Sequence, residues 1–217
     1  MDSKLDLKKV YKDLYSPSAK GISVVDVPPL CFLMVDGQGA PDGEEARQAI
    51  QALFPTAYKL KFASKARGQD YAVMPLEGLW WAEDMSAFTV ERKGDDMQDF
   101  TAGRRDRWKW TYMILQPDFI GASEFEAARA EVSQKKDLPA LEKVRLERYE
   151  EARAAQILHL GPFSEEGPVI QKLHTAIHDL GGQMDGKHHE IYLTDMTRVA
   201  PEKLKTVLRQ PFRLPPG

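Results

Sequence analysis

The sequence has little of what several common classes of protein require. It contains one cysteine, Cys31, which excludes a disulfide framework and any zinc site built from several cysteines. Cys31 lies within the apolar run LCFLMV, which predicts a buried and unreactive thiol. No apolar run reaches the roughly 18–20 residues that a membrane helix needs, and the charged N-terminus lacks the apolar core of a signal peptide. We therefore expect a cytoplasmic protein that makes no contact with the membrane.

The chain also lacks an excess of basic charge. Its formal net charge is −3 at pH 7, which argues against broad affinity for nucleic-acid phosphates and makes direct DNA binding an unfavoured hypothesis. Basic and aromatic residues do alternate in GRRDRWKW (103–110), a pattern that a single-strand nucleic-acid binder could use. The alternative is a loop that enters a strand with lysine and arginine on its solvent side, and the sequence favours this second interpretation.

Motifs for metals, phosphates and acyl transfer are missing as well. The chain has no phosphate-binding glycine loop and no G-x-S-x-G turn. His188 and His189 are neighbours in a predicted strand, so they point to opposite faces and cannot chelate one ion together. His174 and His178 are four residues apart on a predicted helix, but no third ligand accompanies them. We expect neither a metal nor another cofactor.

The order of predicted elements repeats. In each half an apolar strand ends at a glycine, a pair of glutamates (Glu44–Glu45 or Glu165–Glu166) opens a helix, and a strand returns with a central glutamate, Glu77 or Glu190. The order strand–helix–strand–strand, found twice, predicts an α+β fold in which two pseudo-symmetric modules form an antiparallel sheet with helices on one face. A central ligand groove would then lie on the face that the helices leave uncovered.

These elements have approximate boundaries in the sequence. Residues 1–20 are interpreted as an N-terminal extension and 21–217 as a single domain, with modules at about 21–116 and 141–217. Pro55 is expected to kink the first module's helix or to begin a new segment. Ser123 and Glu126 predict a capping box for a helix over 122–135. The tail predicts a short helix that begins at Pro201 and ends at Pro211. The expected strands cover 24–27, 30–35, 71–81, 107–115, 143–150, 154–160 and 188–193.

Strand alternation sorts the aromatic and acidic side chains by face. We expect Ile191 and Leu193 to turn toward the helices, so that Glu190 and Tyr192 face the other way. A second strand carries three aromatic residues on one side; they are Trp108, Trp110 and Tyr112. Such an aromatic stripe is consistent with ordinary core packing. A carboxylate buried among aromatic rings without a partner is unfavourable, however. The pattern therefore favours a site in which a flat apolar or cationic ligand offsets this cost, or in which the raised pKa of the carboxylate is used for acid–base chemistry.

Two segments carry a resemblance to a known family. QILHLGPFSEEGPVIQKLHTAIHDLGGQMDGKHHEIYLTD and YAVMPLEGLWW, the latter followed by RWKWTYMILQP, resemble the GyrI-like small-molecule-binding family of the SOUL/GyrI effector-binding superfamily. The likeness covers most of the chain, from about Val24 to Pro211. It implies a groove for flat, hydrophobic and often cationic compounds, with a strand glutamate at its base. By its place in EIYL, Glu190 matches that glutamate.

The resemblance also implies two kinds of function. Stand-alone relatives include hydrolases that open the cyclopropane ring of DNA-alkylating cyclopropanoid compounds, and no helix-turn-helix segment was found in this sequence. The hydrolase hypothesis assigns catalysis to Glu190 and Tyr192, with Glu77 or Glu166 as a second acid. Binding is assigned to Trp80, Trp108, Trp110, Tyr112, Glu77 and Glu166. The alternatives are a non-catalytic drug-sequestering or sensor protein and a module that modulates a protein partner such as a topoisomerase.

Overall fold

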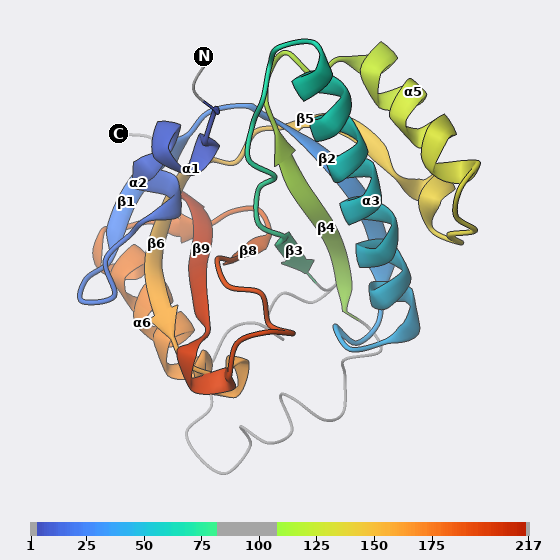
Figure 1. The fold of residues 1–217 in the computed structure, drawn as a ribbon. Helices are drawn as coiled ribbons and strands as arrows, with labels where there is room; N and C mark the ends of the chain where they lie inside the picture. The colour runs from blue at the N-terminus through green and yellow to red at the C-terminus, as the bar shows by residue number, and fades with distance from the viewer. Residues whose placement is uncertain (1–3, 82–107, 216–217) are drawn as a thin grey trace.

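The computed structural model describes residues 4–81 and 108–215. Within them, strands form a nine-stranded antiparallel sheet in the order β1-β6-β9-β8-β3-β4-β2-β5, and β7 pairs with β9 (Figure 1). The strands are β1 (Ser23–Val27), β2 (Leu30–Gln38), β3 (Glu77–Trp81), β4 (Lys109–Gln116), β5 (Arg145–Tyr149), β6 (Ala152–Leu160), β7 (Gln183–Met184), β8 (His188–Tyr192) and β9 (Lys205–Arg213). The helices are α1 (Leu7–Val10), α2 (Lys12–Tyr15), α3 (Glu44–Ala66), α5 (Ala122–Ser133) and α6 (Gly167–Asp179), with short 3-10 turns at Leu141–Lys143, Phe163–Glu165 and Pro201–Lys203.

The sheet is built from a repeated unit, as the sequence predicted. The first unit is β2-α3-β3-β4 and the second is β6-α6-β8-β9, and their strands are arranged symmetrically about the antiparallel pair β3–β8. The two units are thus related by a pseudo-twofold axis between β3 and β8. The axis reverses both the order and the direction of the strands, so it must run perpendicular to the sheet. Such an axis places the equivalent helices α3 and α6 on the same face. The α+β class and the two-module architecture are therefore confirmed; the domain limits stay a prediction.

Glu190 lies on the face that α6 covers. Leu173 and Ile177 of α6 pack with Leu208 of β9, and Leu208 is the cross-strand partner of Glu190. We call this side of the sheet the helix face. The sequence-based expectation that Glu190 and Tyr192 point away from the helices is therefore wrong. The central ligand groove stays a prediction.

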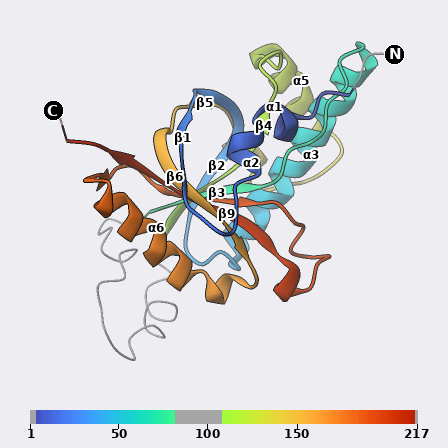
Figure 2. The ribbon, with the colours of Figure 1, turned by 90° about the vertical axis from the view of Figure 1, so that its left-hand side faces the viewer.

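The opposite side of the sheet, here called the N-terminal face, is covered by α1 and α2. Leu7, Leu14 and Tyr15 of these short helices are buried in the main core. The Leu14 carbonyl accepts a hydrogen bond from Arg209 of β9, and the Tyr15 hydroxyl donates one to Glu77 of β3. In Figure 2, α1 and α2 lie on one side of β3 and β9, and α6 lies on the other. Both faces of the central strands are therefore buried.

Three local expectations need correction. Helix α3 continues through Pro55 to Ala66, so no new segment begins at Pro55. Helix α5 begins at Ala122 as expected, but its N-cap is Gly121 rather than Ser123, and the backbone N–H of Gly121 donates to the carboxylate of Glu124 rather than Glu126. In the tail a 3-10 turn does begin at Pro201, but it ends at Lys203, and Lys205–Arg213 form strand β9 instead of continuing the helix to Pro211. The alternation in KTVLRQPF fits a strand, and Pro211 lies in its pairing with β6. No helix in the described residues is long and apolar enough to cross a membrane.

Candidate functional site

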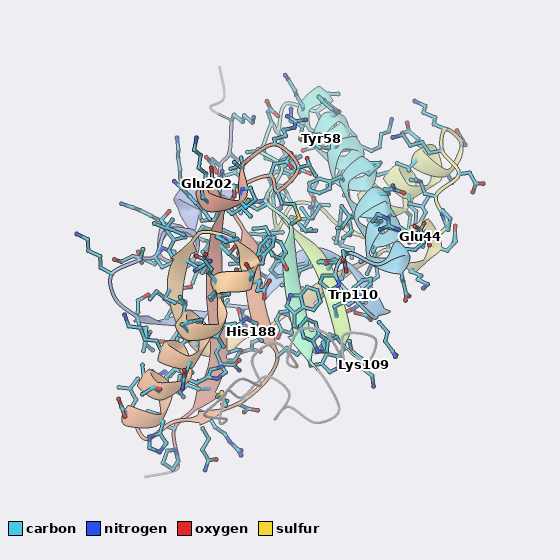
Figure 3. All side chains as sticks on the ribbon, turned by 90° about the horizontal axis from the view of Figure 1, so that it is seen from below. Glu44, Tyr58, Lys109, Trp110, His188 and Glu202 are labelled. Carbon is cyan, nitrogen blue, oxygen red and sulfur yellow. The ribbon has the colours of Figure 1, made fainter. Side chains whose placement is uncertain are left out.

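Two rows of side chains cross the helix face at the junction of the two units. Cross-strand pairing sets Trp110, Trp80 and His188 side by side in the first row. The second row contains Tyr112, Gly78 and Glu190. Figure 3, viewed from below, shows Trp110 and His188 between α3 and α6. The pairing thus gathers residues from three strands and both units, and we call the aromatic and acidic side chains of these rows, with Tyr192, the junction cluster.

The aromatic rings of the junction cluster contact one another. Trp80 makes edge-on contacts with Trp108 and Tyr112, at centroid distances of 5.9 and 5.7 Å, and Trp110 lies 4.8 Å from Tyr112. Trp80, Trp110 and Tyr112 are each at most 3% exposed, while Trp108 is partly exposed. The three aromatic residues predicted as one wall, Trp108, Trp110 and Tyr112, are therefore brought together with Trp80. Their rings pack against each other rather than lining an open surface.

Gly78 makes room for the polar centre of this cluster. A Cβ atom at this position would lie 2.9 Å from Trp80 Nε1 and 3.0 Å from the Tyr192 hydroxyl. Those two groups form a hydrogen bond of 3.2 Å, in which the indole N–H is the donor. The bond joins β3 to β8 and hence the first unit to the second. A residue with a side chain at position 78 would keep the two groups apart.

Tyr192 in turn holds Glu190. Its hydroxyl donates a 2.8 Å hydrogen bond to Glu190 Oε2, and Glu190 Oε1 lies 3.6 Å from His188 Nε2. Burial, followed by the negative charge of Glu190, raises the pKa of Tyr192 well above its usual value. Tyr192 is therefore a neutral hydroxyl at neutral pH and serves as a donor. The Glu190 side chain keeps 16% of its surface exposed, so it can still meet a small molecule.

Glu166 brings a second carboxyl group to the same region. It immediately precedes α6 and is only 5% exposed. Burial, reinforced by the negative charge of Glu190, raises the pKa of Glu166 to about 10, and a hydrogen bond with Thr206 offsets part of that shift. At pH 7 Glu166 is therefore protonated. A buried acid that keeps its proton at neutral pH can serve as a general acid.

Several buried polar atoms around these acids have no hydrogen-bond partner among the described residues. They are Glu166 Oε1, Trp110 Nε1, His174 Nε2 and both ring nitrogens of His188. Burial, with a smaller contribution from His188, lowers the pKa of His174 to about 4, so this histidine is neutral. Unpaired buried polar groups are unfavourable, and at a functional site a ligand or water commonly satisfies them.

Glu77 does not belong to the junction cluster. It lies on the N-terminal face and is 1% exposed, where it accepts hydrogen bonds from Tyr15 and His189. The sequence-based assignment of Glu77 as a second acid beside Glu190 is therefore not supported by its position. Its equivalence to Glu190 in the repeat fails for the same reason: Glu77 directly precedes Gly78, the residue that pairs with Glu190.

Sequence reasoning missed three contributors to the site. Phe163 packs its ring edge-on against Tyr192 at 5.8 Å, Gly78 clears the space described above, and His174 of α6 lies near enough to His188 for that residue to affect its pKa. None of them carried a motif; a glycine inside an aromatic strand was the one available signal. The described residues hold no group of three or more histidine, cysteine or acidic side chains that could ligate a metal. In GRRDRWKW, positions 103–107 lie outside the described residues.

Comparisons with known proteins give strong structural likenesses. An uncharacterized conserved protein from Listeria innocua is 37% identical, with a TM-score of 0.83, and the match covers 97% of this chain and all of that one. A protein described as a hydrolase, also from Listeria innocua, is 37% identical with a TM-score of 0.81 and the same coverage. The C-terminal domain of EcmrR is 12% identical, with a TM-score of 0.52 over 90% of this chain and 98% of that domain, and shares the fold. No family model and no curated protein matches the sequence.

Proposed function

Because this chain belongs to the same family as the two Listeria innocua proteins, one of them described as a hydrolase, we propose that it is a cytoplasmic GyrI-like hydrolase of flat hydrophobic small molecules. The observation that carries the proposal is the pairing of Glu190, held by Tyr192, with the protonated Glu166 beside an aromatic cluster. The substrate class that we favour is a cyclopropanoid compound whose strained ring is conjugated with a carbonyl group.

The aromatic residues would hold the planar part of such a substrate. Trp80, Trp108, Trp110 and Tyr112 offer stacking and edge contacts to a polycyclic ring system. The Trp110 indole can only donate a hydrogen bond, and so it suits an acceptor on the ligand. Since these rings contact one another in the structure, binding requires at least one of them to move aside. Trp108, which is partly exposed, is the ring best placed to do so.

The proposed reaction uses Glu190 as the base and the protonated Glu166 as the acid. Glu190 takes a proton from a water molecule while the water oxygen bonds to a cyclopropane carbon. The ring C–C bond breaks, and its electron pair moves through the conjugated system to the carbonyl oxygen. Glu166 gives its proton to that oxygen, and the proton on Glu190 then returns to Glu166. General acid–base assistance of this type contributes about 10²–10⁴ in rate, and relief of ring strain provides further driving force.

The direct test is incubation of the purified protein with a cyclopropanoid compound, followed by detection of the ring-opened, hydrated product. Turnover above the buffer rate is expected. Glu190→Gln should abolish turnover and leave quenching of tryptophan fluorescence by the compound largely unchanged, because the amide keeps the size of the side chain but cannot take the proton. Glu126→Gln on exposed α5 is the matched control and should retain full activity.

Two outcomes would overturn the proposal. Saturable quenching without product formation would identify a non-catalytic binder that sequesters or senses drugs. Absence of both quenching and product would remove the junction cluster as a small-molecule site and would favour a role in binding a protein partner. Full activity in Glu190→Gln would exclude Glu190 as the base even if the protein is a hydrolase.

A further inference from the structure

A closed ring of buried hydrogen bonds lies on the N-terminal face, behind the junction cluster. The Tyr15 hydroxyl donates to Glu77 at 2.6 Å, and the other oxygen of Glu77 lies 3.0 Å from His189 Nε2. His189 Nδ1 lies 2.9 Å from Glu151, which accepts a 2.9 Å bond from Arg209. Arg209 closes the ring with a 2.8 Å bond to the carbonyl of Leu14, the residue before Tyr15. We call this set the buried ring: Leu14, Tyr15, Glu77, Glu151, His189 and Arg209.

The buried ring is balanced in charge only when His189 is protonated. Both ring nitrogens of His189 face carboxylate oxygens, and an ionised carboxylate only accepts hydrogen bonds, so both nitrogens must carry a proton. His189 and Arg209 then neutralise Glu77 and Glu151. Burial lowers the pKa of His189, but the carboxylate of Glu151 and the hydrogen bonds to Glu151 and Glu77 outweigh it and raise the pKa. Every side chain of the ring is less than 9% exposed, so a broken link cannot be repaired by bulk water.

The ring bridges the same junction that the catalytic candidates bridge. Glu77 of β3 and His189 of β8 join the two units on one face of the sheet. The next residue of each strand, Gly78 and Glu190, is paired on the other face. There the hydrogen bond from Trp80 to Tyr192 crosses the same strand pair. Because both contacts cross the same strand pair, the Glu77–His189 contact also fixes the spacing and register of the strands at the Trp80–Tyr192 contact.

We propose that the buried ring, closed by the N-terminal residues Leu14 and Tyr15, positions Glu190 and Tyr192 of the second unit against Trp80 of the first. Tyr15, Glu77 and His189 are thus positioning residues for the site. The consequence for catalysis rests on the proposed function, whereas the consequence for the Trp80–Tyr192 contact does not. The N-terminal segment, which was interpreted from the sequence as an extension, therefore helps to align the two units through Leu14 and Tyr15.

Tyr15→Phe tests the proposal, because it removes one hydroxyl from the ring and keeps the aromatic packing. Tyr11→Phe is the matched control in the same segment, since no hydrogen bond of the ring involves Tyr11. Two quantities are measured: the indole N–H resonance of Trp80 in a nitrogen–proton correlation spectrum, assigned with Trp80→Phe, and kcat with the dissociation constant of the substrate. In Tyr15→Phe we expect the Trp80 resonance to shift and kcat to fall about tenfold with little change in binding, as misplacement of reacting groups predicts.

The outcomes separate this proposal from the proposed function. If Tyr15→Phe matches Tyr11→Phe in both the resonance and kcat, the ring does not position the site, although the protein remains a hydrolase. If the wild-type protein shows no turnover but Tyr15→Phe shifts the Trp80 resonance, the hydrolase proposal fails and the positioning role stands. Should Tyr15→Phe not fold, Glu77→Gln replaces it. That variant keeps an acceptor for Tyr15 but loses the charge that faces His189, and an unchanged Trp80 resonance in it would overturn the proposal.

Discussion

Glu77 and Glu190 lie on adjacent paired strands, displaced by one residue in register, yet their carboxyl groups occupy opposite faces of the sheet. Glu77 is fixed by Tyr15 and His189 within the buried ring. Glu190 is held by Tyr192 and keeps part of its surface exposed. The strand pair β3–β8 therefore carries a structural carboxylate, Glu77, on the N-terminal face and the candidate catalytic carboxylate, Glu190, on the helix face. Variants on the two faces should affect different properties.

Gly78→Ala should disrupt the junction cluster from its centre. The added methyl group would lie within 3.0 Å of Trp80 Nε1 and the Tyr192 hydroxyl, so their hydrogen bond must open. Forcing a methyl group into a packed core destabilises a protein by about 1–3 kcal/mol. We expect a loss of that size in urea unfolding and weaker quenching of tryptophan fluorescence by ligand. Gly21→Ala is the control, because no atom lies within 4 Å of its added Cβ. Equal stability of the two variants would show that the space above Gly78 is not filled.

Glu166→Gln should stabilise the protein, and increasingly so at higher pH. The pKa of Glu166 is raised from 4.5 to about 10 in the folded state. Its contribution to stability is therefore fully present below about pH 4.5 and declines as pH rises toward 10, by about 1.4 kcal/mol per pH unit in the limiting case. Glutamine cannot ionise and avoids this loss. Melting temperatures of both proteins should converge near pH 4.5 and separate by pH 9. A constant difference across that range would contradict the raised pKa.

Glu151→Gln should have the opposite pH dependence. Burial would raise the pKa of Glu151, but the positive charges of His189 and Arg209 and their hydrogen bonds lower it to about 2. Its stabilising effect is present above about pH 4.5 and is lost as pH falls toward 2. Removing this partner from a buried ion pair costs about 3–5 kcal/mol, so the variant should be less stable at pH 7 and approach wild type in acid. Glu126→Gln, which breaks only the exposed pair with Arg129, should change stability by less than about 1 kcal/mol.

Strand alternation correctly predicted which side chains share a face, but not which face the helices cover. It grouped Trp108, Trp110 and Tyr112, and it grouped Glu190 with Tyr192. Predicting from the sequence which face the helices cover would have required one side of β8 to be exposed to solvent. Both sides are buried, because α1 and α2 cover one face and α6 the other. Ile191 and Tyr192 are then equally suited to a core, and the alternation of residues does not indicate which of them faces α6.

Distant partners account for most of the remaining errors. Glu77 has the sequence environment of an active-site acid, but its partners Tyr15 and His189 are 62 and 112 residues away along the chain. The raised pKa of Glu166 likewise depends first on its burial and then on the charge of Glu190, and both arise only in the assembled second unit. Pro211 suggested the end of a helix, although the pairing of β9 with β6 tolerates a proline at that position. Such contacts are set by the tertiary fold.

Tyr192→Phe should uncouple Trp80 from Glu190. It removes the donor to Glu190 Oε2 and the acceptor for Trp80 Nε1, which leaves the buried indole N–H of Trp80 unpaired and the partly exposed Glu190 without this donor. Loss of a buried hydrogen-bond partner costs about 1–3 kcal/mol, so the variant should be destabilised by that amount. It should also lose much of kcat while still binding the ligand, since the aromatic rings remain. Tyr58→Phe on the exposed side of α3 controls for removal of a hydroxyl group.

A double-mutant cycle with Glu190→Gln decides whether Tyr192 acts through Glu190. If Tyr192 contributes by holding the Glu190 carboxylate, its removal should matter much less once Glu190 is already glutamine. The effects on unfolding free energy should then deviate from additivity by about 0.5–3 kcal/mol, as expected for residues in contact. Additive effects would mean that the 2.8 Å contact contributes nothing measurable, and Tyr192 would then be only a wall of the site.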